Sequence, residues 1–314
     1  MDKQKLTSIF LPTLAEALAR IDKNGLKLAH YTRFDVAKLI LSNRSVWMRN
    51  ARMMNDIGEI DYGIAAMDYA LAEHSDLLVR AVSAIDPSMP MALKGVWQHM
   101  KTNVVKDVFI SCMSEHWPSE DPYGRLSMWR AYGDPDGICL VMNIEAFRLE
   151  SNALNAYSSP VFYGETAQFS DRLKTVLTNV GDSAALLKSS MTSEMILNSL
   201  AMAFLFGAVC LKHPGFAEEQ EWRVIHMPNI RQPSLLRRLD LQGPPAQTIF
   251  EILLEDAPSQ GLVGLTPDAL IHRVIVGPSS HSGAIAQEIT NLLTAQGVAN
   301  AGSRVVQSGI PLRV

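Results

Sequence analysis

Two carboxylates separated by a single residue, Glu219 and Glu221, have the types and spacing most suggestive of chemistry. If this segment enters a strand, both side chains point to one face, because strand side chains alternate with a period of two. Two carboxylates on one face repel, and each raises the pKa of the other. A carboxylate beside a sugar ring stabilises the oxocarbenium-like state through which a glycosidic bond breaks. Trp222 and Arg223 are expected to pack against the pair and hold it, and the simpler alternative is a solvated acidic edge.

A second polar cluster, His30-Tyr31-Thr32-Arg33, lies where a predicted strand meets a predicted amphipathic helix. Polar groups at a helix N-terminus are well placed to bind the phosphates of a ligand. The alternative for Thr32 is an N-cap of the following helix. The alternative for His30 is an ordinary polar histidine of the core or surface.

Two aromatic residues, Trp129 and Tyr132, are three positions apart in a predicted helical turn and therefore share one face. Such a pair usually packs in the core, and the alternative is that it forms a stacking surface for a planar ring. The block at 50–59, with Asn55, Asp56 and Glu59, favours turn and N-cap chemistry before a helix. Its alternative is a lining of the same cleft.

Several standard signatures are absent from the sequence: it has no GxGxxG, GxxxxGK[ST], HExxH or GxSxG motif. Its eight histidines show no metal-ligand spacing, so no metal site is expected. The three cysteines are far apart and form no CxxC pair, which argues against a disulfide framework or a zinc knuckle. Cys139 lies in an apolar run and is expected to be a buried thiol.

The composition excludes several classes of protein. The chain has 314 residues, of which 47% are hydrophobic and 19% charged, and its formal net charge is −4. A disordered chain is excluded, because disorder needs low hydrophobicity and high net charge. A global basic footprint for nucleic acid is absent, although a local one is still possible. The N-terminus lacks the pattern of a secretory signal, and the uncharged run at 195–211 is slightly short of the roughly 20 residues that span a bilayer. We expect a buried core helix there, a cytoplasmic protein and no membrane partner.

Strand and helix patterns intermix along the chain without the regular alternation of a doubly wound sheet, so the predicted class is α+β. No Gly-, Ser- or Pro-rich linker separates two halves, so we expect one elaborated domain over 1–314 with helical insertions at about 57–104 and 170–212. The strands are expected at 26–31, 46–48, 108–113, 138–144, 160–164, 221–227, 248–254, 272–276 and 304–306. Outside the insertions, helices are expected at 4–22, 34–42, 126–132 and 283–296, the last capped by Gly297.

Stretches along most of the chain resemble the bacterial domain-of-unknown-function 2971 family. They are LAHYTRFDVAKLILSNRSVWMRNARMMNDIGEI at 28–60, VFISCMSE at 108–115, SMWRAYGDPDGICLVMN at 127–143, LKHPGFAEEQEWRVI at 211–225, HRVIVGP and the closing SGIPLR. The turn at 133–136 departs from the usual pattern, in which an Ala-Asp step precedes a basic residue.

That family is in turn distantly similar to the ADP-ribosyltransferase superfamily. The similarity implies a split, mixed β-sheet that grips NAD in a cleft. His30, Tyr31 and Thr32 resemble the first-strand motif that holds a ribose of NAD, and Arg33 is the matching candidate for a phosphate contact.

The same similarity gives roles to the aromatic pair and the acidic pair. Tyr132 or Trp129 matches the aromatic residue that stacks on nicotinamide. Glu219-Gln220-Glu221 matches the Glu-x-Glu form of the catalytic loop and strand. Under this resemblance Glu221 is the catalytic carboxylate that bonds the 2′-hydroxyl of the nicotinamide ribose, Glu219 orients the acceptor, and His30 assists.

The resemblance therefore implies an NAD-dependent ADP-ribosyltransferase that modifies a macromolecular acceptor, either a protein or a nucleic acid. Enzymes of this type often act as toxins or antiphage effectors, which implies an antitoxin partner. Two alternatives stay open at this point. One is a non-catalytic module that binds a nucleotide or a protein, for which the Met- and Ala-rich helical insertions suit an interaction surface. The other is an NAD glycohydrolase, with water as the acceptor.

Overall fold

The computed structural model describes residues 2–54, 58–149, 152–230, 235–243 and 246–311. The chain divides into two compact units. Unit 1 comprises Met1–Arg20, Ala51–Val108 and Ser159–Ala217. Unit 2 comprises Ile21–Asn50, Phe109–Ser158 and Glu218–Val314. The two segments expected as helical insertions both belong to unit 1.

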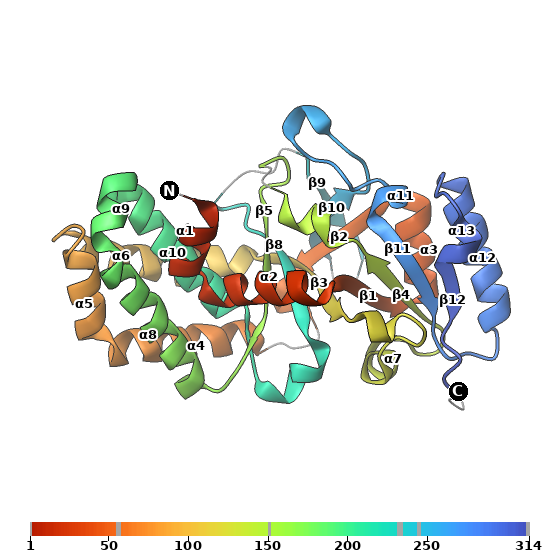
Figure 1. Ribbon diagram of the computed structural model, residues 1–314, viewed down its shortest axis with the longest axis horizontal. Coiled ribbons are helices and arrows are strands. Elements are labelled where there is room, and N and C mark those ends of the chain that lie inside the picture. Colours follow the sequence, from red (N-terminus) through yellow and green to blue (C-terminus); the bar gives the residue numbers. More distant parts are fainter. Residues whose placement is uncertain (1, 55–57, 150–151, 231–234, 244–245, 312–314) are drawn as a thin grey trace. The chain divides into compact units, whose positions relative to one another are not determined.

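Unit 1 is mostly helical, as Figure 1 shows in red, orange and green. Pro12 divides the helix expected at 4–22, because a proline ring cannot continue a helix from within it. The helices of this unit are α1 (Lys3–Phe10), the first part of α2 (Pro12–Asn24), α4 (Glu59–Glu73), α5 (Ser75–Ser83), α6 (Met89–His99), α8 (Thr166–Asp182), α9 (Ala184–Ser190) and α10 (Ser193–Val209). Two short strands, β6 (Phe162–Tyr163) and β7 (Leu211–Lys212), pair in parallel.

The core of unit 1 is built around α10, which packs against α4 and α6. Nine of its residues are buried, so the expectation of a buried helix in the uncharged run is confirmed. Helices α4 and α10 approach so closely at Gly63 that a Cβ atom there would lie 1.8 Å from the carbonyl oxygen of Ala208. Only glycine fits this crossing. Among the described residues, no helix is both long enough and apolar enough to cross a membrane.

Unit 2 contains a ten-stranded, mostly antiparallel sheet formed by residues that the structure describes. The main path runs β12-β11-β4-β1-β3-β2-β10-β9, while β8 pairs with β3 and β5. The α+β class with a mixed sheet is therefore confirmed, since β11 and β12 are parallel. The strands are β1 (Lys27–Arg33), β2 (Ser45–Asn50), β3 (Phe109–His116), β4 (Gly137–Met142), β5 (Ala156–Pro160), β8 (Glu221–His226), β9 (Arg237–Leu241), β10 (Gln247–Leu253), β11 (Ile271–Val276) and β12 (Val305–Gln307).

One edge of β3 is shared by two strands that diverge from each other. Strand β8 pairs with residues 109–114 of β3. Strand β2 pairs with 109–110 and strand β1 with 114–116, both on the edge opposite β8. Residues 111–113 of β3 therefore lie where β1 and β2 separate.

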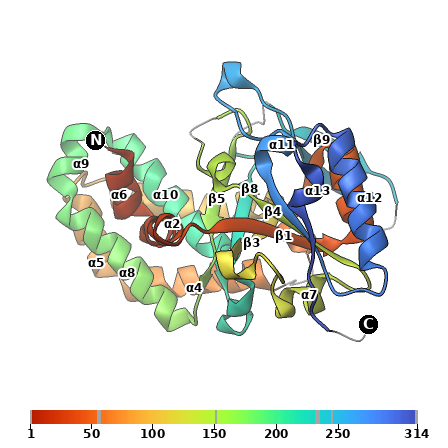
Figure 2. The same ribbon diagram turned by 45° about the vertical axis from the view of Figure 1, so that its right-hand side comes forward.

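Helices cover the sheet of unit 2. Helix α3 (Phe34–Asn43) connects β1 to β2 and packs against both, and α12 (Ser282–Ala295) packs against α3. Helix α7 (Leu126–Tyr132) lies beside β1 in both views (Figures 1 and 2). The remaining helices are the short α11 (Pro267–Leu270) and α13 (Ala301–Arg304). Gly297 ends the α12 region in a left-handed conformation, at the predicted cap.

The strand register assigns side chains to the two faces of this sheet. Ala29, Ser114 and Glu221 are directly opposed on neighbouring strands, so their side chains share one face. We call this the Glu221 face. Met128 and Trp129 of α7 pack on it, in a cluster with Ala29 and other buried side chains. The residues that alternate with these point to the other face, which we call the His30 face because His30 follows Ala29.

Candidate functional site

The Glu219-Gln220-Glu221 segment forms a sharp junction between a helical turn and a strand. A 3₁₀ turn, Pro214–Glu219, ends at Glu219, and β8 begins at Glu221. Gln220 between them has φ of 45°, in the left-handed region that non-glycine residues seldom adopt. The strand alternation that the prediction assumed therefore does not reach Glu219, because the strand begins only at Glu221.

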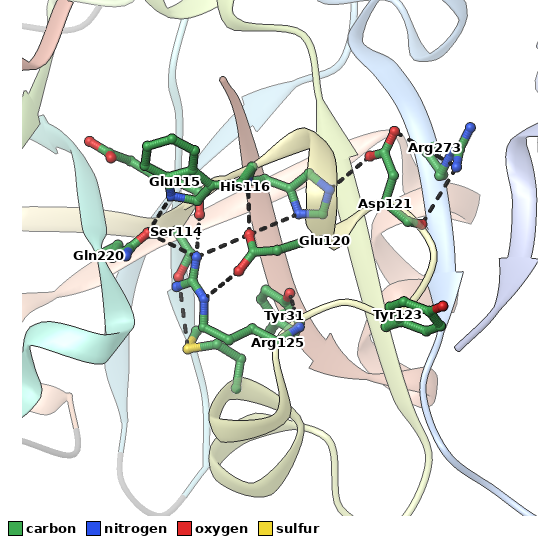
Figure 3. Close-up of polar contacts among 12 residues, drawn as sticks. Tyr31, Ser114, Glu115, His116, Glu120, Asp121, Tyr123, Arg125, Gln220 and Arg273 are labelled. Carbon is green, nitrogen blue, oxygen red and sulfur yellow. Dashed lines mark hydrogen bonds and ion pairs between the residues drawn. The ribbon is translucent and has the colours of Figure 1, made fainter. Parts of the chain in front are cut away.

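Arg125 fixes this junction through its guanidinium, which lies at the centre of the network in Figure 3. The Nη1 group donates to the main-chain oxygens of Glu218 and Glu219 at 2.9 and 3.2 Å. The Nη2 group lies 3.0 Å from Oε1 of Gln220 and 2.6 Å from the main-chain oxygen of Glu115. The strained backbone at Gln220 is thus held by one rigid cation.

A carboxylate and a hydroxyl complete the support of the junction. Glu120 takes the remaining side of the Arg125 guanidinium, with Nε to Oε1 at 2.8 Å and Nη2 to Oε2 at 3.1 Å. The hydroxyl of Ser114 donates to the main-chain oxygen of Glu219. The indole of Trp117 donates to Gln220 Oε1 at 3.1 Å.

The network extends to a buried histidine. His116 Nε2 is 2.9 Å from Oδ1 of Asp121, and Asp121 Oδ2 is 3.7 Å from Arg273 (Figure 3). Burial lowers the pKa of His116, and the bond to Asp121 opposes that shift. His116 is only 1% exposed, so we interpret it as a buried structural support of Glu120 and Asp121.

The two predicted carboxylates have different surroundings. Glu219 is half-buried, and its Oε1 accepts from the hydroxyl of Tyr132 at 2.9 Å. Glu221 is 7% exposed, and both its oxygens bond Arg223, at 2.8 and 3.1 Å. The expectation that Arg223 holds a carboxylate is confirmed for Glu221, whereas Trp222 alternates with Glu221 on β8 and points to the opposite face. A bidentate guanidinium compensates the carboxylate charge and fixes its orientation.

The two predicted aromatic residues also separate. Trp129 is buried in the core cluster, packs edge-to-face on Tyr31 and donates from its indole to the main-chain oxygen of Tyr123 at 2.8 Å. Tyr132 is partly exposed and touches Glu219. For Trp129 the packing alternative therefore holds, and Tyr132 is the accessible ring of α7. The hydroxyl of Tyr31 accepts from the main-chain N–H of Arg125 at 2.8 Å, so Tyr31 supports the Arg125 network.

His30 lies on the other face of the sheet, where it lines a cavity. Its Nδ1 is 2.9 Å from the main-chain oxygen of Cys112, in the gap between β1 and β2. Burial lowers the pKa of this histidine, and the bond to the carbonyl opposes the shift. The structure thus brings Tyr132 and Glu219 together and does not bring the His30 imidazole to them.

The remaining predicted residues have local roles. Helix α3 is capped by Arg33 without a side-chain bond, so the N-cap alternative for Thr32 is wrong. Thr32 is partly exposed on β1, and the exposed guanidinium of Arg33 is paired with Asp35. Glu59 begins α4 and pairs at 2.8 Å with the buried Lys212 in unit 1. Asn55 and Asp56 lie outside the described residues.

Arg125, Ser114 and Glu120 are site residues that sequence reasoning missed. Arg125 precedes a predicted helix and follows a loop with two prolines, so its sequence context indicates only a surface loop. Its role depends on a contact with residues 218–220, about 93 positions away. Within the described ranges, no cluster of three or more His, Cys, Asp or Glu side chains is arranged to hold a metal ion.

Residues 128–224 match the family model described as a protein of unknown function, DUF2971. The matched segment contains Trp129, Tyr132, Glu219 and Glu221, and it supports the predicted resemblance to that family over those residues. No curated protein and no solved structure matches the chain. The similarity to ADP-ribosyltransferases stays a prediction.

Proposed function

We propose that the chain consumes NAD and transfers its ADP-ribose group to a macromolecular acceptor at the Glu219-Gln220-Glu221 junction. The observation that carries the proposal is the arrangement of this junction. Glu219 ends a helical turn and is bonded to a partly exposed tyrosine, while Glu221 begins the following strand and is fixed by an arginine. A reaction through a sugar cation needs fixed negative charge beside the ribose and an aromatic surface for the leaving group.

In the proposed reaction, the bond between C1′ of the ribose and the nicotinamide nitrogen breaks, and the electron pair leaves with nicotinamide. Glu221 bonds the ribose 2′-hydroxyl and stabilises the positive charge that develops on the ring. The acceptor nucleophile then attacks C1′ and loses its proton. Glu219, which is the more exposed carboxylate, orients that acceptor. The ring of Tyr132 packs against the nicotinamide.

Preorganisation is the physical argument for these roles. Electrostatic stabilisation is most effective when charged groups are already in position and need not reorganise during the reaction. Arg223 fixes both oxygens of Glu221, while Arg125 holds the main-chain oxygens of Glu218 and Glu219. Trp129 and the His30 imidazole have no part in the proposed reaction. Trp129 is buried, and His30 lies on the face of the sheet opposite Glu221.

The test is transfer of label from NAD that carries a radioactive phosphate in its adenylate half. Purified protein and labelled NAD are incubated with a bacterial lysate, and label on macromolecules is measured for wild type, Glu221→Gln and Glu219→Gln. We expect transfer by wild type and a loss of at least 100-fold in Glu221→Gln. Glu218→Gln is the matched control, because this neighbouring side chain is exposed and the substitution is identical.

The two alternatives give different results in the same assay. Release of free ADP-ribose in the absence of any macromolecular acceptor indicates a glycohydrolase. Saturable NAD binding without turnover indicates a binding module. Equal absence of transfer and of NAD loss in wild type and Glu221→Gln, with both proteins folded, contradicts the proposal. If wild type does label an acceptor in the lysate, its sensitivity to protease or to nuclease identifies it as protein or nucleic acid.

A further inference from the structure

A cavity of about 130 Å³ lies on the His30 face of unit 2, beside the point where β1 and β2 diverge. Its walls are mainly apolar and include Leu140, Met142, Val224 and Ile252, which come from three strands of the sheet, β4, β8 and β10. Apolar cavities of roughly 150 Å³ stay dry and take up benzene-sized molecules. This cavity therefore has the volume and the lining for a small apolar ligand.

His30 places one hydrogen-bond acceptor in that apolar wall. Its Nδ1 lies 2.9 Å from the carbonyl oxygen of Cys112. A carbonyl only accepts, so Nδ1 carries the proton, and in the neutral imidazole Nε2 is left with a lone pair. Within the described part of the chain, Nε2 has no hydrogen-bond partner. A hydroxyl in the cavity would donate to it.

Ser111 supplies a second polar group close by. It lies on β3 in the gap between β1 and β2, is 7% exposed and lines the same cavity. Strand alternation puts Ser111 on the same face as Met113, which also lines the cavity. Polar groups are few in this lining, and such sparse groups set the orientation of a ligand in an apolar site.

We propose that this cavity binds a small, neutral ligand consisting of an apolar ring with one hydroxyl group, which donates its hydrogen bond to Nε2 of His30. The site lies on the face opposite Glu221 and does not depend on the proposed ADP-ribosyl transfer. A charged group is disfavoured there, because burying an unpaired charge among aliphatic side chains is costly. A dinucleotide is far larger than the cavity.

Two probes that differ by one hydroxyl test the proposal: 4-fluorophenol and fluorobenzene, each titrated with the full chain and followed by fluorine NMR. We expect saturable binding of both, with 4-fluorophenol at least tenfold tighter. Ala156→Leu places extra carbons in the cavity and should abolish binding of both probes, since Ala156 lines it. Ala295→Leu is the matched control at an exposed position of α12, and it should bind as wild type does.

The histidine is tested separately. His30→Leu should reduce 4-fluorophenol affinity to that of fluorobenzene and leave fluorobenzene binding intact. If that variant does not fold, the nitrogen-15 chemical shifts of the wild-type His30 imidazole are measured instead. Addition of 4-fluorophenol should change the chemical shift of Nε2 more than that of Nδ1.

Three results would overturn the proposal: no saturable binding of either probe, equal affinity for the two, or unchanged binding in Ala156→Leu. Glu221→Gln should bind both probes as wild type does, so a failure of the proposed ADP-ribosyl transfer can be distinguished from a failure of the cavity proposal.

Discussion

Replacement of Arg125 by methionine should destabilise unit 2 and release the Glu219 junction. The guanidinium has five N–H groups, and among the described residues six acceptor atoms surround it. Methionine preserves much of the apolar stem and removes every one of these donors. The Glu120 carboxylate then remains largely buried without its cation.

The size of the effect follows from the burial of the pair. Removing one partner of a buried ion pair typically costs about 3–5 kcal/mol. The side chains of Arg125 and Glu120 are 13% and 17% exposed, so residual solvation favours the lower end, about 3 kcal/mol. For a domain the size of unit 2, each kcal/mol lowers the melting temperature by about 2–4 °C, which gives a fall of roughly 6–12 °C.

The assay is urea unfolding followed by circular dichroism, with a thermal melt on the same samples. Arg130→Met is the matched control, because Arg130 is an exposed arginine of the adjacent helix and should change stability by less than about 0.5 kcal/mol. A loss below about 1 kcal/mol in Arg125→Met, or an equal loss in the control, would show that Arg125 does not stabilise unit 2 through this ion pair.

Two further predictions concern stability. Burial lowers the folded-state pKa of His30 and His116, so the unfolded chain binds their protons more tightly, and the free energy of unfolding should fall as pH drops below about 6.5. Urea titrations at pH 7.5 and 5.5 check this, and equal stability at both contradicts it. Gly63→Ala should cost at least about 1–3 kcal/mol, because its Cβ would collide with the Ala208 carbonyl. The control is Gly95→Ala, whose Cβ meets open space in a helix, and this variant should be more stable than wild type by up to about 1 kcal/mol. A Gly63→Ala variant as stable as wild type would be inconsistent with the close crossing.

Periodicity and turn residues predict the local elements well. The helix expected at 34–42 is α3, the helix expected at 126–132 is α7, and the strand expected at 221–227 is β8. These signals are local, since apolar spacing and glycine conformations depend only on neighbouring residues. Strand β9 was not predicted, because three of its five residues, Arg237, Arg238 and Asp240, are polar and exposed, and its two leucines are only half-buried.

The site is harder to predict because its contacts are distant in sequence. The Glu-x-Glu spacing correctly singles out a junction, but the left-handed Gln220 breaks the strand alternation that the spacing assumes. Tyr132 and Glu219 are 87 positions apart, and no local pattern reveals their bond. A shift of one residue along β1 decides which face a side chain takes, and this places Tyr31 and His30 on opposite sides of the sheet.

Glu221 is the residue that we propose supports cleavage of NAD. The most direct measurement is the rate of nicotinamide release from NAD by the purified chain in the presence of lysate, compared among wild type, Glu221→Gln and the Glu218→Gln control. We expect release by wild type and by Glu218→Gln, and a rate at least 100-fold lower for Glu221→Gln. Equal rates in wild type and Glu221→Gln, or no release by folded wild type, would contradict it.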